Sequence, residues 1–345
     1  MFFEVYGETA GWQLLGWLLV FTGLVVMNEI ARRTKAGGIA CFIVLPLALT
    51  VYFIAIYIGA AMGADWALNN DTYVHMNSWF HYAKLYAATI GCVGFMVLKY
   101  QWGKLGKSHW FKAYPFIIVA INILIAVASD FESAIKSGSL AGGWWQSSEG
   151  VWLYGGWWNL LNGLAGIINI FCMTGWWGIY PSKDKKDMLW PDMIWIYVLA
   201  YDVWNFQYTY LNLPTHAWYC GLALLLAPTF AAALWNKGGW IQNRANTLAL
   251  WCMFAQIFPL FQDNSRFSII PSVYGEGATI ATATGSSMPT VAEPHMQGII
   301  SVLAFGINVF AFAYILKKAH KEKTNPWKNE IFKDTKDYQE AMERA

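Results

Sequence analysis

The sequence predicts an all-α protein, a bundle of about nine helices that crosses a membrane. Three observations predict this fold class. Hydrophobic residues make up 57% of the chain and charged residues only 13%, whereas soluble domains carry about 25% charged residues. Nine apolar runs come close to the length of roughly 20 residues that a transmembrane helix needs. Aromatic residues reach 17%, with 21 Trp, and Trp and Tyr favour the two membrane interfaces.

The predicted helices follow one another along almost the whole chain. They cover residues 12–30, 38–62, 77–98, 112–130, 155–180, 189–211, 214–236, 244–262 and 297–316. The first, second and ninth are the most uniformly apolar, while the sixth to eighth carry polar residues and Pro. We expect no cleaved signal peptide, because the first ten residues are acidic and the first apolar run is long enough to remain as an anchor.

The positions of Lys and Arg predict the orientation. Basic residues accumulate on the cytoplasmic side of membrane proteins. With the N-terminus outside, the cytoplasmic segments hold 20 of the 23 Lys and Arg residues. These segments are 31–37, 99–112, 181–188, 237–244 and 317–345. We therefore expect the N-terminus outside and the C-terminus in the cytoplasm.

One transmembrane domain, residues 1–316, is expected to precede a charged cytoplasmic tail, residues 317–345. The tail is too short to form a core, and its basic start is expected to contact anionic lipid headgroups rather than nucleic acid. Two outer loops, residues 131–154 and 263–296, are longer than connectors need to be. The second is either a lid over an outward-facing cavity or a disordered connector.

Acidic residues give the outer face a net negative charge. The outer segments hold ten acidic residues against two basic ones. Such a face favours cationic or neutral solutes. Alternatively, the acids simply occupy loops from which membrane insertion excludes Lys and Arg.

Amide side chains form a stripe on the fifth predicted helix. Asn159, Asn162, Gly166 and Asn169 are three or four residues apart, so they share one face. Polar groups at membrane depth are costly and often mark function. The stripe either lines a pathway or packs against neighbouring helices, since small and amide residues also join membrane helices.

The sixth predicted helix carries the residue that we rank first, Asp202. At 1.5 Å per residue, Asp202 lies about 10 Å below the outer boundary of the membrane core, and Lys84 on the third helix lies at about the same depth. Because a buried charge needs a partner, we expect the two to form an ion pair on the floor of an outward-facing cavity. The alternative is that each bonds separately to amides and water.

An acid–base site is a second interpretation of the same region. His81 with Asp71, or His216 with Asp202, is a suitable pair if the fold brings the two together. The sequence contains no His spacing typical of a metal site. The five Cys lie in apolar stretches and are expected to be core residues, not disulfides or ligands. No cofactor is indicated.

Two neighbouring runs carry a family resemblance. The run from Tyr201 to Asn205 (YDVWN) and the run from Leu213 to Gly221 (LPTHAWYCG) resemble an uncharacterised bacterial family of multi-pass membrane proteins, domain of unknown function 5692. The resemblance implies a bacterial inner or plasma membrane, but no substrate, reaction or functional residue.

Three functions follow as hypotheses. The first is a transporter or permease with a polar, aromatic-lined cavity that binds a small molecule from the outer side. Its expected binding residues are Asp202, Lys84, Asn162, Asn205, Asn159, Tyr201, Trp204 and Tyr208. The second is an enzyme that acts on a lipid or amphiphilic molecule at the outer boundary through Asp202, His81 and His216. The third is a sensor or structural component of the membrane.

The first two hypotheses differ in how far the polar lining should extend. A transporter predicts a lining that continues to the cytoplasmic side through Asn122, Asn169, Gln256 and Asn308. An enzyme predicts a cavity that closes beneath Asp202. The lipid bilayer and a small-molecule ligand are the expected partners, and no oligomeric state is indicated.

Overall fold

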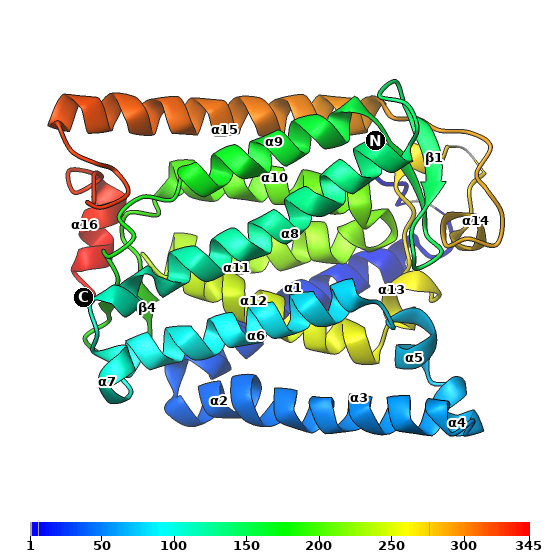
Figure 1. The fold of residues 1–345 in the computed structure, drawn as a ribbon, viewed down its shortest axis with the longest axis horizontal. Coiled ribbons are helices and arrows are strands. Elements are labelled where there is room, and N and C mark those ends of the chain that lie inside the picture. The colour runs from blue at the N-terminus through cyan, green and yellow to red at the C-terminus, as the bar shows by residue number, and fades with distance from the viewer. Residues whose placement is uncertain (1, 6, 276) are drawn as a thin grey trace.

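Long helices run side by side in this computed structural model, which describes residues 2–5, 7–275 and 277–345 (Figure 1). The long helices are α1 (Ala10–Arg33), α3 (Leu45–Ala61), α6 (Trp79–Lys99), α8 (Tyr114–Lys136), α9 (Trp157–Phe171), α10 (Trp195–Asn212), α11 (Leu224–Leu234), α12 (Trp240–Ile257) and α15 (His295–Glu322). Three of them are lengthened at their start. The added segments are α2 (Lys35–Ile39) with the π-helical turn Ala40–Val44 before α3, the 3-10 turn Trp110–Ala113 before α8, and the turns Pro214–His216 and Ala217–Ala223 before α11.

The remaining elements are short and lie at the two ends of the bundle. The short helices are α4 (Asp65–Leu68), α5 (Asp71–His75), α7 (Gly103–Gly106), α13 (Leu260–Asp263), the 3-10 turn Ser272–Tyr274, α14 (Ile280–Ala283) and α16 (Lys336–Met342). Strands β1 (Gly143–Gln146) and β2 (Trp152–Gly155) form one antiparallel hairpin, and β3 (Tyr180–Pro181) and β4 (Met188–Leu189) form a smaller one.

Six helical segments are long and apolar enough to cross a membrane, so the protein is membrane-embedded. They are Ala10–Arg33, Lys35–Ala61, Trp79–Lys99, Trp110–Lys136, Pro214–Leu234 and His295–Glu322. Helix α9 has 15 residues, and α10 and α12 have 18 each but carry more polar side chains. These three pack among the apolar helices, with α9 between α8 and α15 and α12 between α6 and α11.

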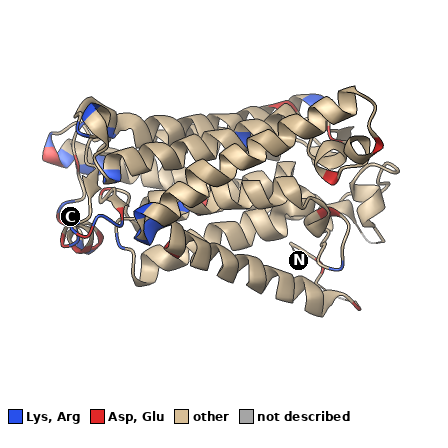
Figure 2. Ribbon diagram, turned by 90° about the horizontal axis from the view of Figure 1, so that it is seen from below, with Lys and Arg blue, Asp and Glu red and all other residues tan. Residues whose placement is uncertain are grey.

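The two ends of the bundle differ in structure and charge. We call the end with α16 and the C-terminus the tail end, and the opposite end, with β1 and α14, the loop end (Figure 1). The N-terminal residues lie at the loop end, where Phe3 forms a β-bridge with Pro271. Lys and Arg gather at the tail end (Figure 2), which is the asymmetry that membrane insertion produces.

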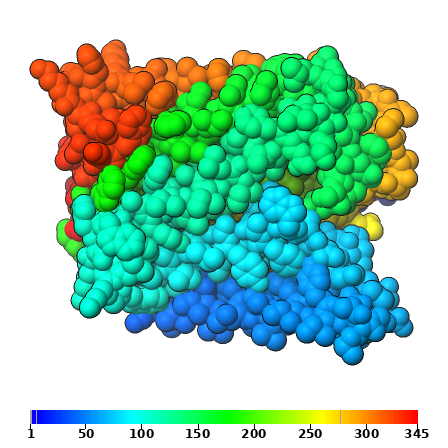
Figure 3. All heavy atoms as spheres, viewed as in Figure 1, coloured from blue at the N-terminus to red at the C-terminus, as the bar shows by residue number. Residues whose placement is uncertain are grey.

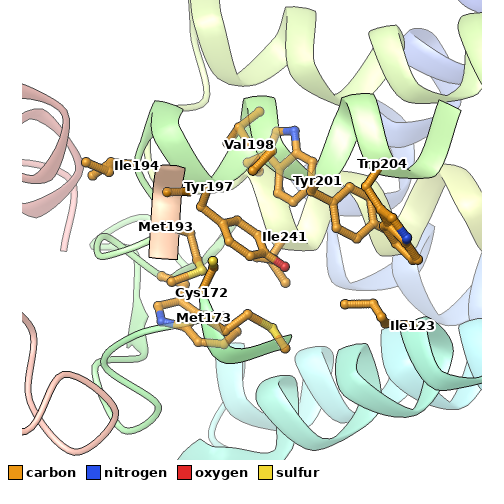
Figure 4. Packing of buried hydrophobic residues seen from close by; sticks show 14 of the residues in the cluster. Ile123, Cys172, Met173, Met193, Ile194, Tyr197, Val198, Tyr201, Trp204 and Ile241 are labelled. Carbon is orange, nitrogen blue, oxygen red and sulfur yellow. The ribbon is translucent and has the colours of Figure 1, made fainter. Parts of the chain in front are cut away.

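Helix α10 forms the centre of the larger hydrophobic core. Its Tyr197, Tyr201 and Trp204 lie next to residues of α8, α9 and α12, including Ile123 and Ile241 (Figure 4). The rings of Tyr201 and Trp204 meet edge to face with centroids 5.5 Å apart, an arrangement that aromatic rings favour. Helices α6, α8 and α9 lie on the face seen in Figure 3, between α3 at one edge and α15 at the other.

The fifth predicted helix is shorter than expected. Helix α9 ends at Phe171, nine residues before the predicted end. Gly175 adopts a left-handed φ of +58°, and the Gly175 and Trp176 amides donate to carbonyls of Pro326 and Trp327 in the tail. The tail therefore takes the backbone hydrogen bonds that a longer helix would have used internally.

Both predicted outer loops contain ordered structure. Residues 131–154 complete α8 and begin the β1–β2 hairpin. The loop at 263–296 packs on that hairpin, since the Tyr274 hydroxyl donates to the Trp152 carbonyl at 2.6 Å and its ring stacks on Trp144. Burial of these aromatic groups explains why a segment rich in small residues takes a defined course.

The charged tail folds back onto the bundle instead of extending from it. Ile331 and Phe332 are each 1% exposed, and their amides donate to the buried carboxylate of Asp192. Asp192 also accepts from Thr174. Segments of the chain that are far apart in sequence thus meet at one carboxylate.

Asp187 is the second anchor of the tail. Its carboxylate is fully buried and accepts two hydrogen bonds of 2.9 Å from Arg32 of α1. Arg344 of the tail also donates to it, as does Gln242 of α12. These hydrogen bonds and ion pairs offset much of the free energy that the carboxylate loses when it leaves water.

Substitution of Asp187 by Asn is expected to destabilise the tail end. Removing one partner of a buried ion pair costs about 3–5 kcal/mol, because the other charge remains buried. The variant should unfold at a lower temperature in detergent and release the tail to limited proteolysis. Asp184→Asn is the matched control, because Asp184 lies in the same loop but pairs with Lys186 in a half-exposed position. Equal stability of the two variants would contradict the assigned role.

Substitution of Gly166 by Ala is expected to disturb the contact of α9 with α8 and α10. An added Cβ would lie 2.6 Å from Val127 and 2.7 Å from the Trp204 indole nitrogen, and such overpacking costs about 1–3 kcal/mol. Gly306→Ala in α15 is the control, since nothing lies within 4 Å of its Cβ position and Ala favours a helix by up to about 1 kcal/mol. Thermal unfolding in detergent should place the two variants on opposite sides of the native protein.

Candidate functional site

A cavity lies between α6, α10 and α12, and one face of each helix lines it. On α10 the lining residues are Tyr201, Asn205, Tyr208 and Thr209, at the spacing of a single helical stripe. On α12 they are Arg244, Leu248, Trp251, Cys252, Ala255 and Gln256. Helix α6 contributes Phe80, His81 and Lys84, and α8 contributes Asn122. The cavity contains about 800 Å³ of space that no atom fills, part of it open to solvent.

Lys84 reaches this cavity, as the sequence predicts, but without a charged partner. Its ammonium group donates to the carbonyl of Asn122 at 3.0 Å. It also lies 5.6 Å from the ring centroid of Tyr208 and 5.7 Å from that of Phe80, within the range of cation–π attraction. Among the described residues, no carboxylate forms an ion pair with Lys84.

The expected pair of Lys84 with Asp202 is therefore wrong. Asp202 lies one residue beyond the cavity stripe of α10, so its side chain points about 100° away from that of Tyr201. One carboxylate oxygen accepts from Thr229 of α11 at 2.7 Å, and the other has no hydrogen-bond partner. The depth estimate did not show that Asp202 lies on the side of α10 that faces away from the cavity and Lys84.

Arg244 is the cavity residue that the sequence prediction missed. We predicted it in a cytoplasmic loop, because the apolar run starts there, but α12 begins one turn earlier at Trp240. The side chain is 7% exposed. It donates to the amide oxygen of Asn205 at 3.1 Å and lies 5.7 Å from the ring centroid of Tyr201. Its Nε and Nη1 atoms have no hydrogen-bond partner.

A regular spacing could have identified Arg244. Arg244, Leu248, Cys252 and Gln256 are four residues apart, so they share one face of any helix that includes all of them. Hydropathy alone concealed this, because the polar residues from Gln242 to Asn246 resemble a loop.

A wider vestibule meets the cavity at two His residues. His81 and His216 line both spaces. The vestibule contains about 1270 Å³ that no atom fills and lies at the loop end. Its further lining residues include Glu149, Asp263, Asn264, Ile280, Thr284 and Ser286. The second outer loop thus forms part of the vestibule wall.

Each of these His residues faces a carboxylate other than the one we expected. His216 Nε2 lies 2.5 Å from Asp263 Oδ1, and His81 Nδ1 lies 3.8 Å from Glu149 Oε1. Burial raises the pKa of Asp263, but the charge and hydrogen bond of His216 outweigh it, so the pKa lies below its usual value. Asp263 belongs to α13, which follows the bend at Pro259, and Glu149 lies in the β1–β2 turn. The spacing of residues in the sequence does not show that α13 and the β1–β2 turn fold back onto these two His residues.

The amide stripe of α9 lies in contacts between helices and does not line the cavity. Asn162 donates to the buried carboxylate of Asp130 at 2.8 Å, and Asn212 donates to the same carboxylate at 2.6 Å. The Trp204 indole donates to the carbonyl of Asn162. Asn159 is also fully buried and accepts from the amide of Gly156. Asp130 is thus the centre of this cluster.

The expected polar path toward the cytoplasmic side divides into two groups. Asn122 and Gln256 line the cavity. Asn169 instead donates to Asn308 at 2.8 Å, and Asn308 donates to the carbonyl of Ala200. Both residues are fully buried, so this pair joins α9, α10 and α15 and does not extend the lining.

The described residues contain no cluster of side chains suited to binding a metal ion. No group of three or more His, Cys, Asp or Glu side chains is placed there to hold an ion. The five Cys are free thiols; four are buried and Cys252 is half-buried.

Comparison with known proteins identifies the family. A family model described as "Family of unknown function (DUF5692)" matches residues 7–344, so the chain belongs to that family. No curated protein and no solved structure matches the chain.

Cys252 provides a test of access to the cavity. A variant that retains Cys252 and has its other four Cys replaced by Ala is expected to react with a small, membrane-impermeant thiol reagent. Because the vestibule opens at the loop end, the reagent should react from that side of the membrane only. The control retains Cys172 alone, which is 1% exposed and donates to the Asn308 carbonyl. Equal rates for the two variants would show that the cavity is closed.

Proposed function

We propose that this member of the DUF5692 family is a transporter of a small polar solute, which enters from the loop end. In this proposal α9, α10 and α12 also cross the membrane, giving nine spans. The gathering of Lys and Arg at the tail end supports an outside N-terminus and a cytoplasmic C-terminus. The location would then be a cell membrane, as a multi-pass protein.

The observation that supports this proposal is a deep cavity that shares His81 and His216 with the vestibule at the loop end. The lining on α12 extends from Arg244 to Gln256, which corresponds to about 18 Å along the helix. In a membrane-embedded structure, the presence of charged and amide groups at this depth is costly. A water-filled entrance for a solute accounts for their presence.

Below the cavity, side-chain hydrogen bonds close the tail end. Asn28 of α1 donates to Asn243 and accepts from Asn246, both on α12. Asn236 donates to Asn243 and to Asp187. Polar contacts of this kind can be exchanged for water, whereas a packed apolar plug cannot. This favours a closed state that is able to open, as alternating access requires.

The pair of His216 with Asp263 favours a second candidate, an enzyme that acts at the cavity mouth. A carboxylate that orients a His is a common arrangement for general-base catalysis. His216 lines both the cavity and the vestibule, and Asp263 lines the vestibule. In this alternative, Asp263 takes the role that we expected for Asp202, and a bound substrate would be converted without crossing the membrane.

Transport is tested by blocking the cavity after the protein has folded. Proteoliposomes that contain the Cys252-only variant are expected to accumulate at least one solute from a panel of small labelled anions, zwitterions, cations and neutral molecules. Attachment of a bulky thiol reagent to Cys252 should abolish this uptake, because the group fills the cavity. A cysteine-free variant treated in the same way should be unaffected.

Other outcomes of this experiment separate the candidates. Binding of a solute without uptake would refute transport and leave the enzyme or a sensor. Conversion of the solute, lost in His216→Gln but unchanged in His109→Gln, would support the enzyme. His109 lies in the segment before α8 and lines neither the cavity nor the vestibule.

A further inference from the structure

We propose that the cavity binds a small organic carboxylate between Lys84 and Arg244. This inference rests on the proposed function for the site itself and adds the chemical class of its ligand. It reverses the expectation from the outer loops, whose acidic residues favoured cationic or neutral solutes.

The lining of the cavity carries positive charge without a matching negative charge. It includes Lys84, Arg244 and two His residues, but no Asp or Glu among the described lining residues. An Arg side chain remains charged in proteins. Its contact with Asn205 is to a neutral amide, and the contact of Lys84 is to a neutral carbonyl. A buried cation without a counter-ion is costly, so an anion would be attracted.

Other buried cations in this protein show the contrast. Arg32 is 4% exposed and pairs with both Asp187 and Glu29. Arg344, which is half-buried, pairs with the same Asp187. Lys99 is 3% exposed and forms no ion pair among the described residues, but it donates to the carbonyls of Arg32 and Lys186. Arg244 is 7% exposed, and it is the cation of the described residues whose buried nitrogens lack hydrogen-bond partners.

The nearby acidic groups do not line the cavity. Asp202 bonds to Thr229 and does not line the cavity. Asp263 and Glu149 belong to the vestibule, where they face His216 and His81.

The rest of the lining indicates an organic ligand of limited size. Aromatic and aliphatic groups surround the cations, among them Phe80, Tyr201, Tyr208, Leu248 and Trp251. The roughly 800 Å³ that no atom fills, part of it open to solvent, lies in the range of about 300–1,000 Å³ that small-molecule sites have. A small aromatic or aliphatic carboxylate suits a space of this size. The buried hydroxyl of Tyr208 has no partner and can donate to the ligand.

Three molecules of one shape and different charge test the ligand class. Benzoate, benzamide and benzylamine differ in charge but hardly in size. In purified protein in lipid nanodiscs, calorimetry is expected to show benzoate binding about tenfold or more tightly than the other two. Lys84→Met and Arg244→Gln should each lower the affinity for benzoate by about tenfold or more. Lys136→Met, which removes an exposed charge outside the cavity, should leave it unchanged.

Thiol chemistry supplies a second measurement that does not require a charge-removing variant to fold. In the Cys252-only protein, an anionic methanethiosulfonate is expected to react faster than a cationic one of similar size, relative to their rates with a free thiol. Benzoate should slow the reaction. Equal or cation-favouring rates, or benzylamine binding as tightly as benzoate, would overturn the proposal. If none of the three molecules binds, the reagent rates decide.

These results are distinguishable from a failure of the transport proposal. Binding and labelling require no flux, so an anion preference without uptake would refute transport and retain the ligand class. Uptake of cations or neutral solutes alone, with no anion preference at Cys252, would refute the ligand class and retain transport.

Discussion

The structure depends on the constraint that a polar group buried among membrane helices must find its partner within the protein. The bilayer core supplies no water to replace a missing hydrogen bond. Asp187 satisfies this constraint most fully, since Arg32, Arg344, Gln242 and Asn236 all donate to it. Because these donors come from α1, α12, the preceding turn and the tail, satisfying one carboxylate also fixes how those segments meet.

The candidate site is the place where this constraint is not met. Around Asp130, Asp187 and Asp192, several donors surround each buried carboxylate. In the cavity between α6, α10 and α12, the charged groups of Lys84 and Arg244 have neutral partners only. Two guanidinium nitrogens of Arg244 have no hydrogen-bond partner at all, and an unsatisfied buried group of this kind calls for an explanation such as a ligand that supplies the missing partner. The proposed site therefore rests on unsatisfied hydrogen-bonding groups and not on a sequence motif.

Charge is also arranged in order along the entrance. Acidic residues lie in the vestibule wall, each facing a His, and basic residues lie deeper in the cavity. The net charge of the outer loops thus describes the entrance and not the binding space. Tertiary contacts of α13 and of the β1–β2 turn produce this separation, because they bring Asp263 and Glu149 onto His216 and His81. The two His residues are consequently the structural boundary between the two spaces.

Composition and hydropathy by themselves determined the membrane-embedded helical class, and the family resemblance at Tyr201 to Gly221 was confirmed by a match over residues 7–344. The sequence also predicted Tyr201, Asn205, Tyr208 and Lys84 as binding residues, and all four line the cavity. Only the tertiary structure decided that Asp202 faces Thr229, that Asn162 and Asn212 donate to Asp130, and that Arg244 contacts Asn205. Depth along a helix is a local property of the sequence. The direction of a side chain, and the loops that fold back onto it, depend on contacts between different helices, such as those of Thr229 with Asp202, Asn162 with Asp130 and Arg244 with Asn205.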